Sequence, residues 1–323
     1  MIMVMAGGVG AARFLAGLMQ VVPASDVVAV VNTGDDTELH GLSISPDIDT
    51  VTYTLSGSID PTRGWGLRDE SWRAMEALAR FEDVRPQGSA AAPRWFNLGD
   101  TDLATHFYRT ARLREGATLA EVTDEIRRAF GLDLTIVPMS NDSVRTIVHL
   151  HDGPVPFQEY FVRLQHSVEV TKVEFVGADT ASFIDLDYIT NADTVVIAPS
   201  NPIVSIGPLR ALPGVEDALR ATRDHVVAVS PIVAGAALKG PADRMLVELG
   251  HEPTVVGVAR MYAPICSTLI IDTQDEHLVS AVEREGMRCI ATDTIMSKPG
   301  VSAALAKIAV GATPRKGGQS WHD

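Results

Sequence analysis

Few cysteines, no basic run and no long apolar run limit what this chain of 323 residues can be. Cys266 and Cys289 are too few for a disulfide framework or a zinc site, so a cytoplasmic protein is expected. The apolar residues 1–5 are too short for a signal peptide or a membrane span, so no membrane partner is expected. With 27 Lys and Arg against 41 Asp and Glu, the net charge of -14 argues against a nucleic-acid partner.

The order of apolar runs predicts an α/β fold of the Rossmann-like, doubly wound type with a mainly parallel sheet. A strand at 2–5, a glycine-rich turn, a helix at 11–19 and an apolar strand at 27–31 form the first unit. Further segments are expected as strands at 194–198, 226–229, 254–259 and 268–271, and as helices at 242–249 and 276–285, and the run 301–310 closes the fold. Residues 1–60 and 190–312 are therefore predicted to form the nucleotide-binding core, followed by a disordered tail at 313–323.

The middle of the chain has a different pattern and is predicted to be an inserted cap, residues 61–189. Turn-forming residues separate its elements, and one loose segment lies at 86–93. Helices are expected at 69–80, 98–113 and 119–130, and small antiparallel strands at 134–137, 144–150 and 167–176.

A glycine-rich turn with Gly7, Gly8, Val9 and Gly10 lies between the first strand and the first helix. Glycines at such a turn let the backbone approach a phosphate, and the amides at the helix start can bind it. The pattern is not a full dinucleotide fingerprint, because Arg13 stands where the third glycine would be, and no G-K-[ST] follows. The alternative is a turn that is merely tight. We predict phosphate binding by Gly8, Val9, Gly10 and Arg13.

The segment 32–50 brings four carboxylates, Asp35, Asp36, Asp47 and Asp49, to the end of the second strand. Carboxylates held close together repel one another unless a proton or a cation lies between them. Mg²⁺ bridging diphosphate oxygens would be the natural occupant, although acids in such turns are usually just solvated. The adjacent pair Asp35–Asp36 favours a metal over a nicotinamide cofactor, for which one ribose-binding acid would suffice.

Ser45 and Pro46 predict a helix that starts at Pro46, with Ser45 as N-cap and Asp47 as a first-turn acid. Asp47 and Asp49 then point about 200° apart, so they cannot face one small ion in a regular helix. Asp47 is interpreted as the structural acid and Asp49 as the functional one, because the helix dipole explains Asp49 less well.

Two further polar groups follow predicted strand ends or helix starts. Asp100, Thr101, Asp102 and His106 lie at the start of a helix, where ligand binding and simple first-turn acids are equally expected. The remaining predicted nucleotide contacts follow the second strand and two later strands: Asn32, Ser200, Asn201 and Lys239. For Lys239 the alternative is a solvated surface lysine.

Together these motifs resemble the 2-phospho-L-lactate transferases of coenzyme F420 biosynthesis, including their actinobacterial phosphoenolpyruvate transferase form. The resemblance covers nearly the whole chain. It depends on the order and spacing of AGGVGAARFLAGL, NTGDD, HGLSISPDIDTVTYTLSGSIDPTRGWG, WFNLGDTDLATH, VPMSNDSVRT, VGAD and APSNPIVSIGPL.

The resemblance implies a guanosine diphosphate donor that carries phosphoenolpyruvate or 2-phospholactate, and the deazaflavin Fo as acceptor. The terminal hydroxyl of Fo attacks the distal phosphorus and GMP leaves, with Mg²⁺ as cofactor and a homodimer as the expected assembly. Asp36 and Asp49 become the catalytic carboxylates, and Asp35, Asp36 and Asp49 the metal ligands. Asp49 maps onto the Fo-binding acid of the family, with Asp100, Thr101, Asp102, His106 and Trp65 as the other expected Fo contacts; Trp65 or Trp95 either stacks on the deazaflavin or packs the cap.

One position departs from the family pattern G-D-R-D-L-A-T-H: Thr101 replaces an arginine that is taken to contact Fo. Either Arg94 or Arg109 substitutes for it, or acceptor binding differs. A second hypothesis is a nucleotide-sugar-binding regulatory protein of the gluconeogenesis-factor type, which has a similar glycine-rich opening and acid loop. The stretches IDPTRGWG and GDTDLATH favour the transferase.

Overall fold

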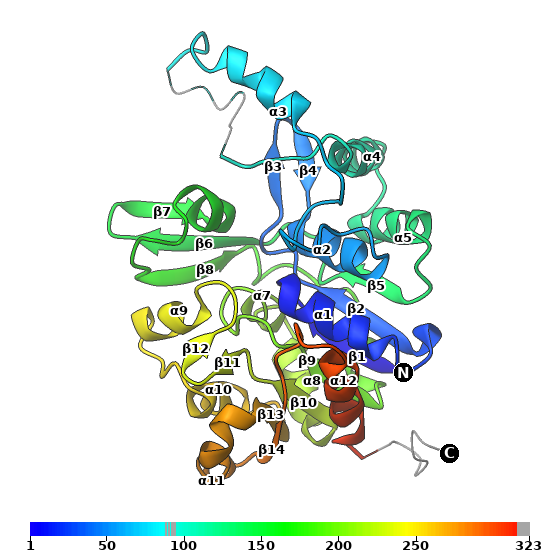
Figure 1. Ribbon diagram of the computed structural model, residues 1–323, viewed down its shortest axis with the longest axis vertical. Helices are drawn as coiled ribbons and strands as arrows, with labels where there is room; N and C mark the ends of the chain where they lie inside the picture. The colour runs from blue at the N-terminus through cyan, green and yellow to red at the C-terminus, as the bar shows by residue number, and fades with distance from the viewer. Residues whose placement is uncertain (88, 90, 92–94, 315–323) are drawn as a thin grey trace.

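Seven parallel strands form the central sheet in the computed structural model, which describes residues 1–87, 89, 91 and 95–314 (Figure 1). The strand order is β14-β13-β10-β9-β1-β2-β5, so the first strand lies inside the sheet between β9 and β2. The bounds are β1 Ile2–Ala6, β2 Val27–Val31, β5 Thr135–Pro138, β9 Thr194–Ile197, β10 Val226–Val229, β13 Thr268–Asp272 and β14 Arg288–Thr292.

Every residue of the inner strands β1, β2, β9 and β10 is buried, and all but Thr194 are apolar, as expected when helices cover both faces of a sheet. Alternate residues of β1 enter two separate cores: Met3 and Met5 pack into one, while Ile2 and Val4 pack into the other. The predicted α/β class is confirmed. It brings the carboxyl ends of β1, β2 and β9 to one edge, where ligands of such sheets bind.

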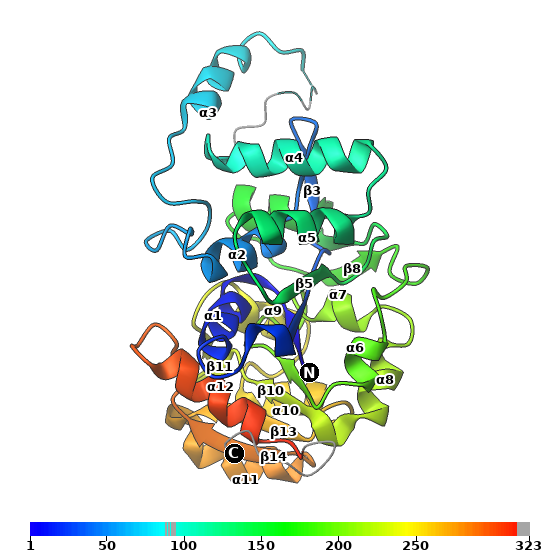
Figure 2. The same cartoon turned by 90° about the vertical axis from the view of Figure 1, so that its right-hand side faces the viewer.

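Helices cover the two faces unequally. On one face α1 packs against both α2 and α12, and Figure 2 shows α1 and α12 side by side. The helices of the core are α1 Gly8–Leu18, α2 Pro46–Leu55, α6 Asp187–Thr190, α7 Gly207–Arg210, α8 Val215–Ala221, α9 Ala242–Glu248, α10 Val255–Tyr262, α11 Val279–Arg284 and α12 Val301–Gly311. Short helical turns precede some of them, at η1 Ala24–Asp26, η4 Arg223–His225 and η5 Thr273–Leu278.

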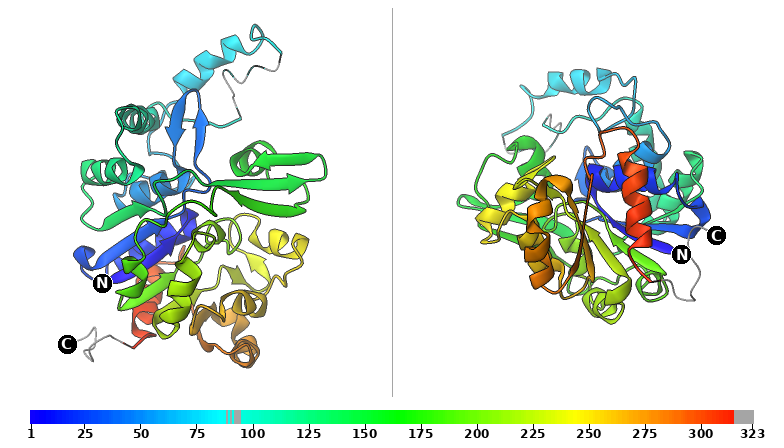
Figure 3. Two further views of the ribbon diagram at one scale, coloured as in Figure 1. Left: turned by 180° about the vertical axis from the view of Figure 1, so that it is seen from behind. Right: turned by 60° about the horizontal axis from the view of Figure 1, so that its bottom comes forward.

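The cap lies beyond the edge of the sheet at which the glycine turn lies (Figures 1 and 3). A hairpin rises from the acid segment, α4 packs on its second strand and on α5, and a three-stranded antiparallel sheet projects to one side. Its elements are β3 Thr37–Leu39, β4 Leu42–Ile44, α3 Arg73–Leu78, η2 Ala79–Phe81, α4 Asp102–Arg114, α5 Leu119–Ala129, β6 Arg145–Leu150, β7 Gly153–Pro156, η3 Glu159–Arg163 and β8 Lys172–Val176. A two-stranded hairpin in the core, β11 Ile232–Val233 and β12 Ala236–Ala237, follows β10.

Two element predictions were wrong. The run 254–259 is part of helix α10 rather than a strand, because the Thr254 hydroxyl caps the helix by accepting a hydrogen bond from the Gly257 amide at 3.2 Å. The run 134–137 is not a small antiparallel strand: β5 pairs in parallel with β2 at the edge of the central sheet. The hairpin β3–β4 and the strands β7, β11, β12 and β14 were not predicted at all.

Because β5 belongs to the central sheet, the predicted insertion 61–189 contributes to the core as well as to the cap. The rest of that division stays a prediction. In the predicted tail 313–323, the Thr313 hydroxyl is 2.7 Å from that of Thr194, and residues 315–323 lie outside the described residues. None of the helices in the described ranges is long and apolar enough to cross a membrane.

Candidate active site

The turn between β1 and α1 is packed so closely that its glycines leave no room for larger residues. A Cβ on Gly10 would lie 2.0 Å from the Pro199 carbonyl oxygen, and one on Gly7 would lie 2.8 Å from the Ser205 Cβ. Gly8 adopts a φ of +69°, which glycine tolerates best. The Ser200 hydroxyl donates to the Gly7 carbonyl at 2.7 Å, so the loop after β9 is fixed against this turn. The predicted residues Gly8, Val9, Gly10 and Ser200 are thereby brought together.

Asn32, directly after β2, connects this turn to the acid segment. Its side-chain amide donates to Asp47 Oδ2 at 3.0 Å, and its Oδ1 accepts from the Gly34 amide at 2.9 Å. Asp47 Oδ2 is also 3.2 Å from the position of a Gly7 Cβ. The predicted structural acid Asp47 therefore lies buried beside the glycine turn and is held there by Asn32.

Three buried carboxyl groups of this segment resist ionisation. Burial, and then the charge of Asp47, raises the pKa of Asp35 well above its usual value. Burial likewise raises the pKa of Asp36 well above its usual value, against the hydrogen bond from Ser45. Burial raises the pKa of Asp47 to about 6, although hydrogen bonds from Asn32 and Gly8 act in the opposite direction. A cation beside these groups would relieve the cost of their charges.

The residues fit a magnesium ion by the chemistry of their free oxygens. Asp35 Oδ1 and Asp36 Oδ1 are buried and have no hydrogen-bond partner in the described structure. No three His, Cys, Asp or Glu side chains among the described residues are grouped so that they could hold a metal ion. Mg²⁺ at a phosphate-transfer site commonly uses only one or two carboxylates and takes its other oxygens from phosphate and water. Asp35 and Asp36 would therefore be the ligands most ready to hold it.

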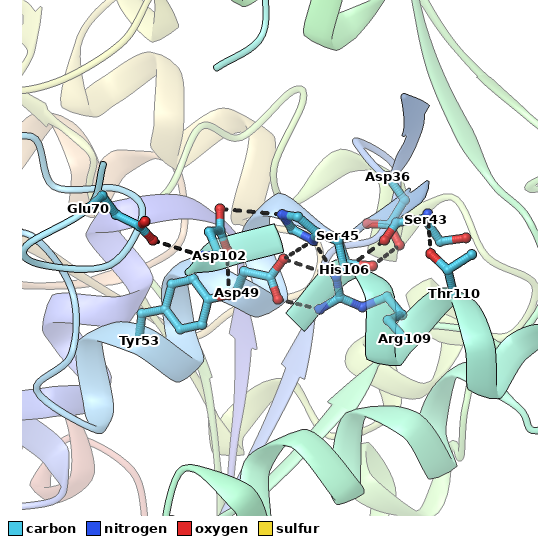
Figure 4. Close-up of polar contacts among 10 residues, drawn as sticks. All are labelled: Asp36, Ser43, Ser45, Asp49, Tyr53, Glu70, Asp102, His106, Arg109 and Thr110. Carbon is cyan, nitrogen blue, oxygen red and sulfur yellow. Dashed lines mark hydrogen bonds and ion pairs between the residues drawn. The ribbon is translucent and has the colours of Figure 1, made fainter. Parts of the chain in front are cut away.

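Asp49 faces the opposite side of α2 and is paired with Arg109 of α4 (Figure 4). Both guanidinium amino groups donate to this carboxylate, Nη1 to Oδ2 at 3.1 Å and Nη2 to Oδ1. Arg109 is 0% exposed, and its Nη1 is also 3.2 Å from His106 Nδ1. Asp49 is thus already neutralised by a buried arginine, unlike Asp35 and Asp36.

The same network continues to the start of α4 and back to the acid segment (Figure 4). The Tyr53 hydroxyl donates to Asp102 Oδ1 at 2.6 Å, and His106 Nε2 lies 3.3 Å from Asp102 Oδ2. Burial opposes the charge of Asp102, but hydrogen bonds from His106 and Tyr53 keep the pKa of Asp102 below its usual value. At the other end the Ser45 hydroxyl donates to Asp36 Oδ2 at 2.6 Å. The predicted residues Asp49, Asp102 and His106 therefore lie along one buried polar network, and Asp36 is linked to it through Ser45, whose carbonyl accepts from the Asp49 amide at 3.0 Å.

Comparison with known proteins identifies the family of this chain. A family model described as 2-phospho-L-lactate transferase CofD matches residues 2–309. The chain belongs to the CofD family. A phosphoenolpyruvate transferase from Kitasatospora aureofaciens is 40% identical over 317 residues, which cover 96% of each chain. One from Streptomyces griseus is 41% identical over 316 residues, which cover 96% of this chain and 97% of that one.

Two solved structures of one Bacillus halodurans protein, described as a member of the UPF0052 family, share the fold. One has a TM-score of 0.61 at 14% identity and the other a TM-score of 0.58 at 15% identity. Each comparison covers 96% of this chain and 98% of the other. The family match confirms the resemblance seen in the sequence: the protein is a CofD-family transferase, a family that belongs to coenzyme F420 biosynthesis.

In this CofD-family chain the start of α4 is fixed by two acids that cap each other's segments. Glu70 accepts hydrogen bonds from the Thr101 and Asp102 amides, both at 2.8 Å. Asp100 accepts in turn from the Arg73 amide at 3.1 Å and the Ala74 amide at 3.0 Å. Asp100 is thus engaged in holding α3.

Gly99 and Thr101 lie on either side of Asp100 at the start of α4. A Cβ on Gly99 would lie 2.2 Å from Glu70 Cδ, so glycine is what lets the Glu70 carboxylate reach the helix start. The Thr101 side chain is exposed, and of the two arginines predicted to compensate for it, Arg94 lies outside the described residues. Arg109 is fully buried, and both of its terminal amino groups are bound to Asp49.

Three other predicted residues lie in loops away from the Asp49 network. The guanidinium of Arg63 lies over Trp65 and Trp72, 5.4 and 5.1 Å from their ring centroids, so one face of Trp65 is already used. Trp65 is still 43% exposed. Asn201 Oδ1 accepts from the Ile203 amide at 2.9 Å and so shapes its own loop. Lys239 Nζ lies 3.0 Å from the position of a Gly64 Cβ, in the same loop as Trp65.

Sequence reasoning missed Tyr53 and Glu70 and took Arg109 only as a substitute for position 101. A signal existed for two of them. Tyr53 follows Asp49 by four residues on α2, and Arg109 follows His106 by three on α4, spacings that put side chains on one helix face. Glu70 lies in an irregular segment before α3, where no periodicity could have placed it.

Proposed function

We propose that this chain transfers a phosphoenolpyruvyl group, or a 2-phospholactyl group, from a guanosine diphosphate donor to the terminal hydroxyl of the deazaflavin Fo. The hydroxyl oxygen forms a bond to the distal phosphorus, the bond to the bridging oxygen breaks, and GMP leaves with that oxygen. The curated relatives named phosphoenolpyruvate transferase favour the first of these two groups.

The observation that carries the proposal is the placement of unpartnered acids beside a glycine turn. Asp47 is held against Gly7 and Gly8, and Asp35 and Asp36 each keep one buried oxygen without a partner. Amides at a helix start bind phosphate, and a cation between phosphate and acid offsets the charge of both. This pairing suits a diphosphate better than a neutral ligand.

Asp35 and Asp36 would hold the Mg²⁺, and Asp49 would join them only by giving up a hydrogen bond to Arg109. When bound, the ion would neutralise charge on the diphosphate and its leaving oxygen. With Oδ1 on the ion, Asp36 would accept the hydroxyl proton on Oδ2, the oxygen that the Ser45 hydroxyl holds in place. Asp49, Asp102 and His106 would orient Fo. Cytoplasmic location and a homodimer remain expectations from the sequence and the resemblance.

The test measures GMP release and the Fo-containing product by mass spectrometry, with donor, Fo and Mg²⁺ present together. Asp36→Asn should lower the rate by at least about 100-fold, since a positioned acid–base group contributes about 10² to 10⁴. Asp152→Asn is the matched control, because Asp152 is an exposed turn acid. The proposal fails if GMP release does not need Fo, if Asp36→Asn matches the control, or if a uridine diphosphate sugar binds without turnover in place of the guanine donor.

A further inference from the structure

Two cations near the glycine turn have no acidic partner. Arg13 lies on α1, about 7 Å along the helix axis from Gly8 by the rise per residue. Lys239 follows β12, and its amino group packs against the buried Gly64 of the cap loop. Within the described ranges no carboxylate forms an ion pair with either side chain. Partial burial, and then the charge of Arg13, lowers the pKa of Lys239, so the two cations are near enough to repel each other.

The other arginines around the turn and the acid segment are already engaged. Arg109 is bound to Asp49 in the core of the network. Arg63 pairs with Asp60 at 3.0 Å, and its guanidinium also contacts the indole rings of Trp65 and Trp72. Arg13 and Lys239, by contrast, form no ion pair with a carboxylate of the described residues, and Lys239 lies where the segment after β12 meets the cap loop.

The proposed donor carries a negative charge that a pair of basic side chains could bind. Its two phosphodiester groups carry one negative charge each, and Mg²⁺ together with the amides of the glycine turn offsets these. The three-carbon acid adds a carboxylate, which the buried acids Asp35, Asp36 and Asp47 would repel. A third negative charge needs its own cation, and the planar guanidinium of an arginine suits a carboxylate.

We infer that Arg13 and Lys239 bind the carboxylate of the three-carbon acid and so select donors that carry one, rather than binding the diphosphate. This inference rests on the proposed function, since that function supplies the donor. It assigns the phosphate groups to the glycine turn and the metal, and the acid end to the space between α1 and the Gly64 loop. Lys239 then joins the core and the cap through the bound donor.

Equilibrium binding without Fo tests the inference and needs no turnover. Calorimetry in the presence of Mg²⁺ compares three probes: the carboxylate donor, an analogue with a carboxamide in its place, and GDP. Wild-type protein should bind the carboxylate donor at least about tenfold more tightly than the carboxamide, the size expected for one charge-assisted hydrogen bond. Lys239→Met and Arg13→Met should each weaken the carboxylate donor and leave carboxamide and GDP affinities within about twofold of wild type.

Two further variants make the result specific. Lys239→Arg should keep the preference for the carboxylate, and Lys307→Met, an exposed lysine on α12, should change nothing. The inference is overturned if GDP affinity falls as much as donor affinity, because the cations then bind phosphate. It is equally overturned if wild-type protein does not distinguish carboxylate from carboxamide. Failure of the proposed function is a separate result, namely tight donor binding by wild-type protein without product when Fo is added.

Discussion

Replacing Arg109 by methionine isolates the buried ion pair on which the Asp49 network depends. Methionine keeps most of the aliphatic length of the side chain, so little cavity is created and the main change is loss of the charge. Asp49 would then be a buried carboxylate whose two oxygens have lost their donors. Removing one partner of a buried pair costs about 3–5 kcal/mol, because the other charge stays buried without compensation.

The structure offers a matched control on the same helix. Arg112 lies three residues after Arg109 on α4 and pairs with Glu115 and Glu125, but its side chain is 31% exposed. Solvent screens exposed pairs, so Arg112→Met should cost much less than Arg109→Met. The double variant Arg109→Met with Asp49→Asn removes both charges, and its cost should be smaller than the sum of the two single changes by at least about 1 kcal/mol.

The assay is urea unfolding followed by circular dichroism, with equal slopes required before midpoints are converted to free energies. The reasoning is refuted if Arg109→Met and Arg112→Met destabilise the protein equally, or if the double variant shows no coupling. Either outcome would mean that the carboxylate of Asp49 reaches water or another donor once the arginine is gone.

Two further predictions concern the glycine turn and the acid cluster. Gly10→Ala places a Cβ 2.0 Å from the Pro199 carbonyl oxygen, so it should lower the free energy of unfolding by about 1–3 kcal/mol and weaken GDP binding. Gly311→Ala is the control, because its Cβ would have nothing within 4 Å and should leave the stability unchanged or raise it. Urea unfolding measures the stability and calorimetry measures the GDP affinity. The pKa of Asp47 is higher in the folded state than in the unfolded chain. The free energy of unfolding should therefore fall as the pH rises from 3.8 to about 6, and this fall should be absent in Asp47→Asn. Added Mg²⁺ should raise the unfolding midpoint more at pH 8 than at pH 5, because the carboxyl groups must lose their protons to bind it; an equal rise at both pH values would contradict a carboxylate site.

The sequence predicted those features of the site that depend only on residues close together in the chain. The sequence Ser45-Pro46 predicted the start of α2 at the residue where the structure has it, and the helical period predicted that Asp47 and Asp49 face different neighbours. Ser45 occupies the N-cap position of α2 as predicted, but its hydroxyl donates to Asp36 and makes no side-chain cap on the helix. A competing carboxylate nearby outweighed the local preference, and sequence alone did not show that it was near.

Partners far apart in the chain could not be predicted in this way. Arg109 is separated from Asp49 by 60 residues, and Glu70 meets the Thr101 amide across 31. An apolar run such as 254–259 suits a buried strand and a buried helix equally, and a threonine cap decided for the helix. Likewise the sequence of β5 predicts a short strand but not its partner, and only the parallel pairing with β2 places it in the central sheet.

These contacts give the two acids in the first turn of α2, Asp47 and Asp49, different roles. Its first turn presents Asp47 to the glycine turn and Asp49 to α4, so one helix start borders both neighbourhoods. The acids on the first side have raised pKa values and unpartnered oxygens, which suits a cation and a diphosphate. The acid on the second side is held by Arg109, which suits a group that must keep its position while an acceptor hydroxyl aligns. Asp36 joins the two, because it has one free oxygen and accepts from Ser45 with the other, and a hydroxyl that attacks phosphorus at this boundary would meet it.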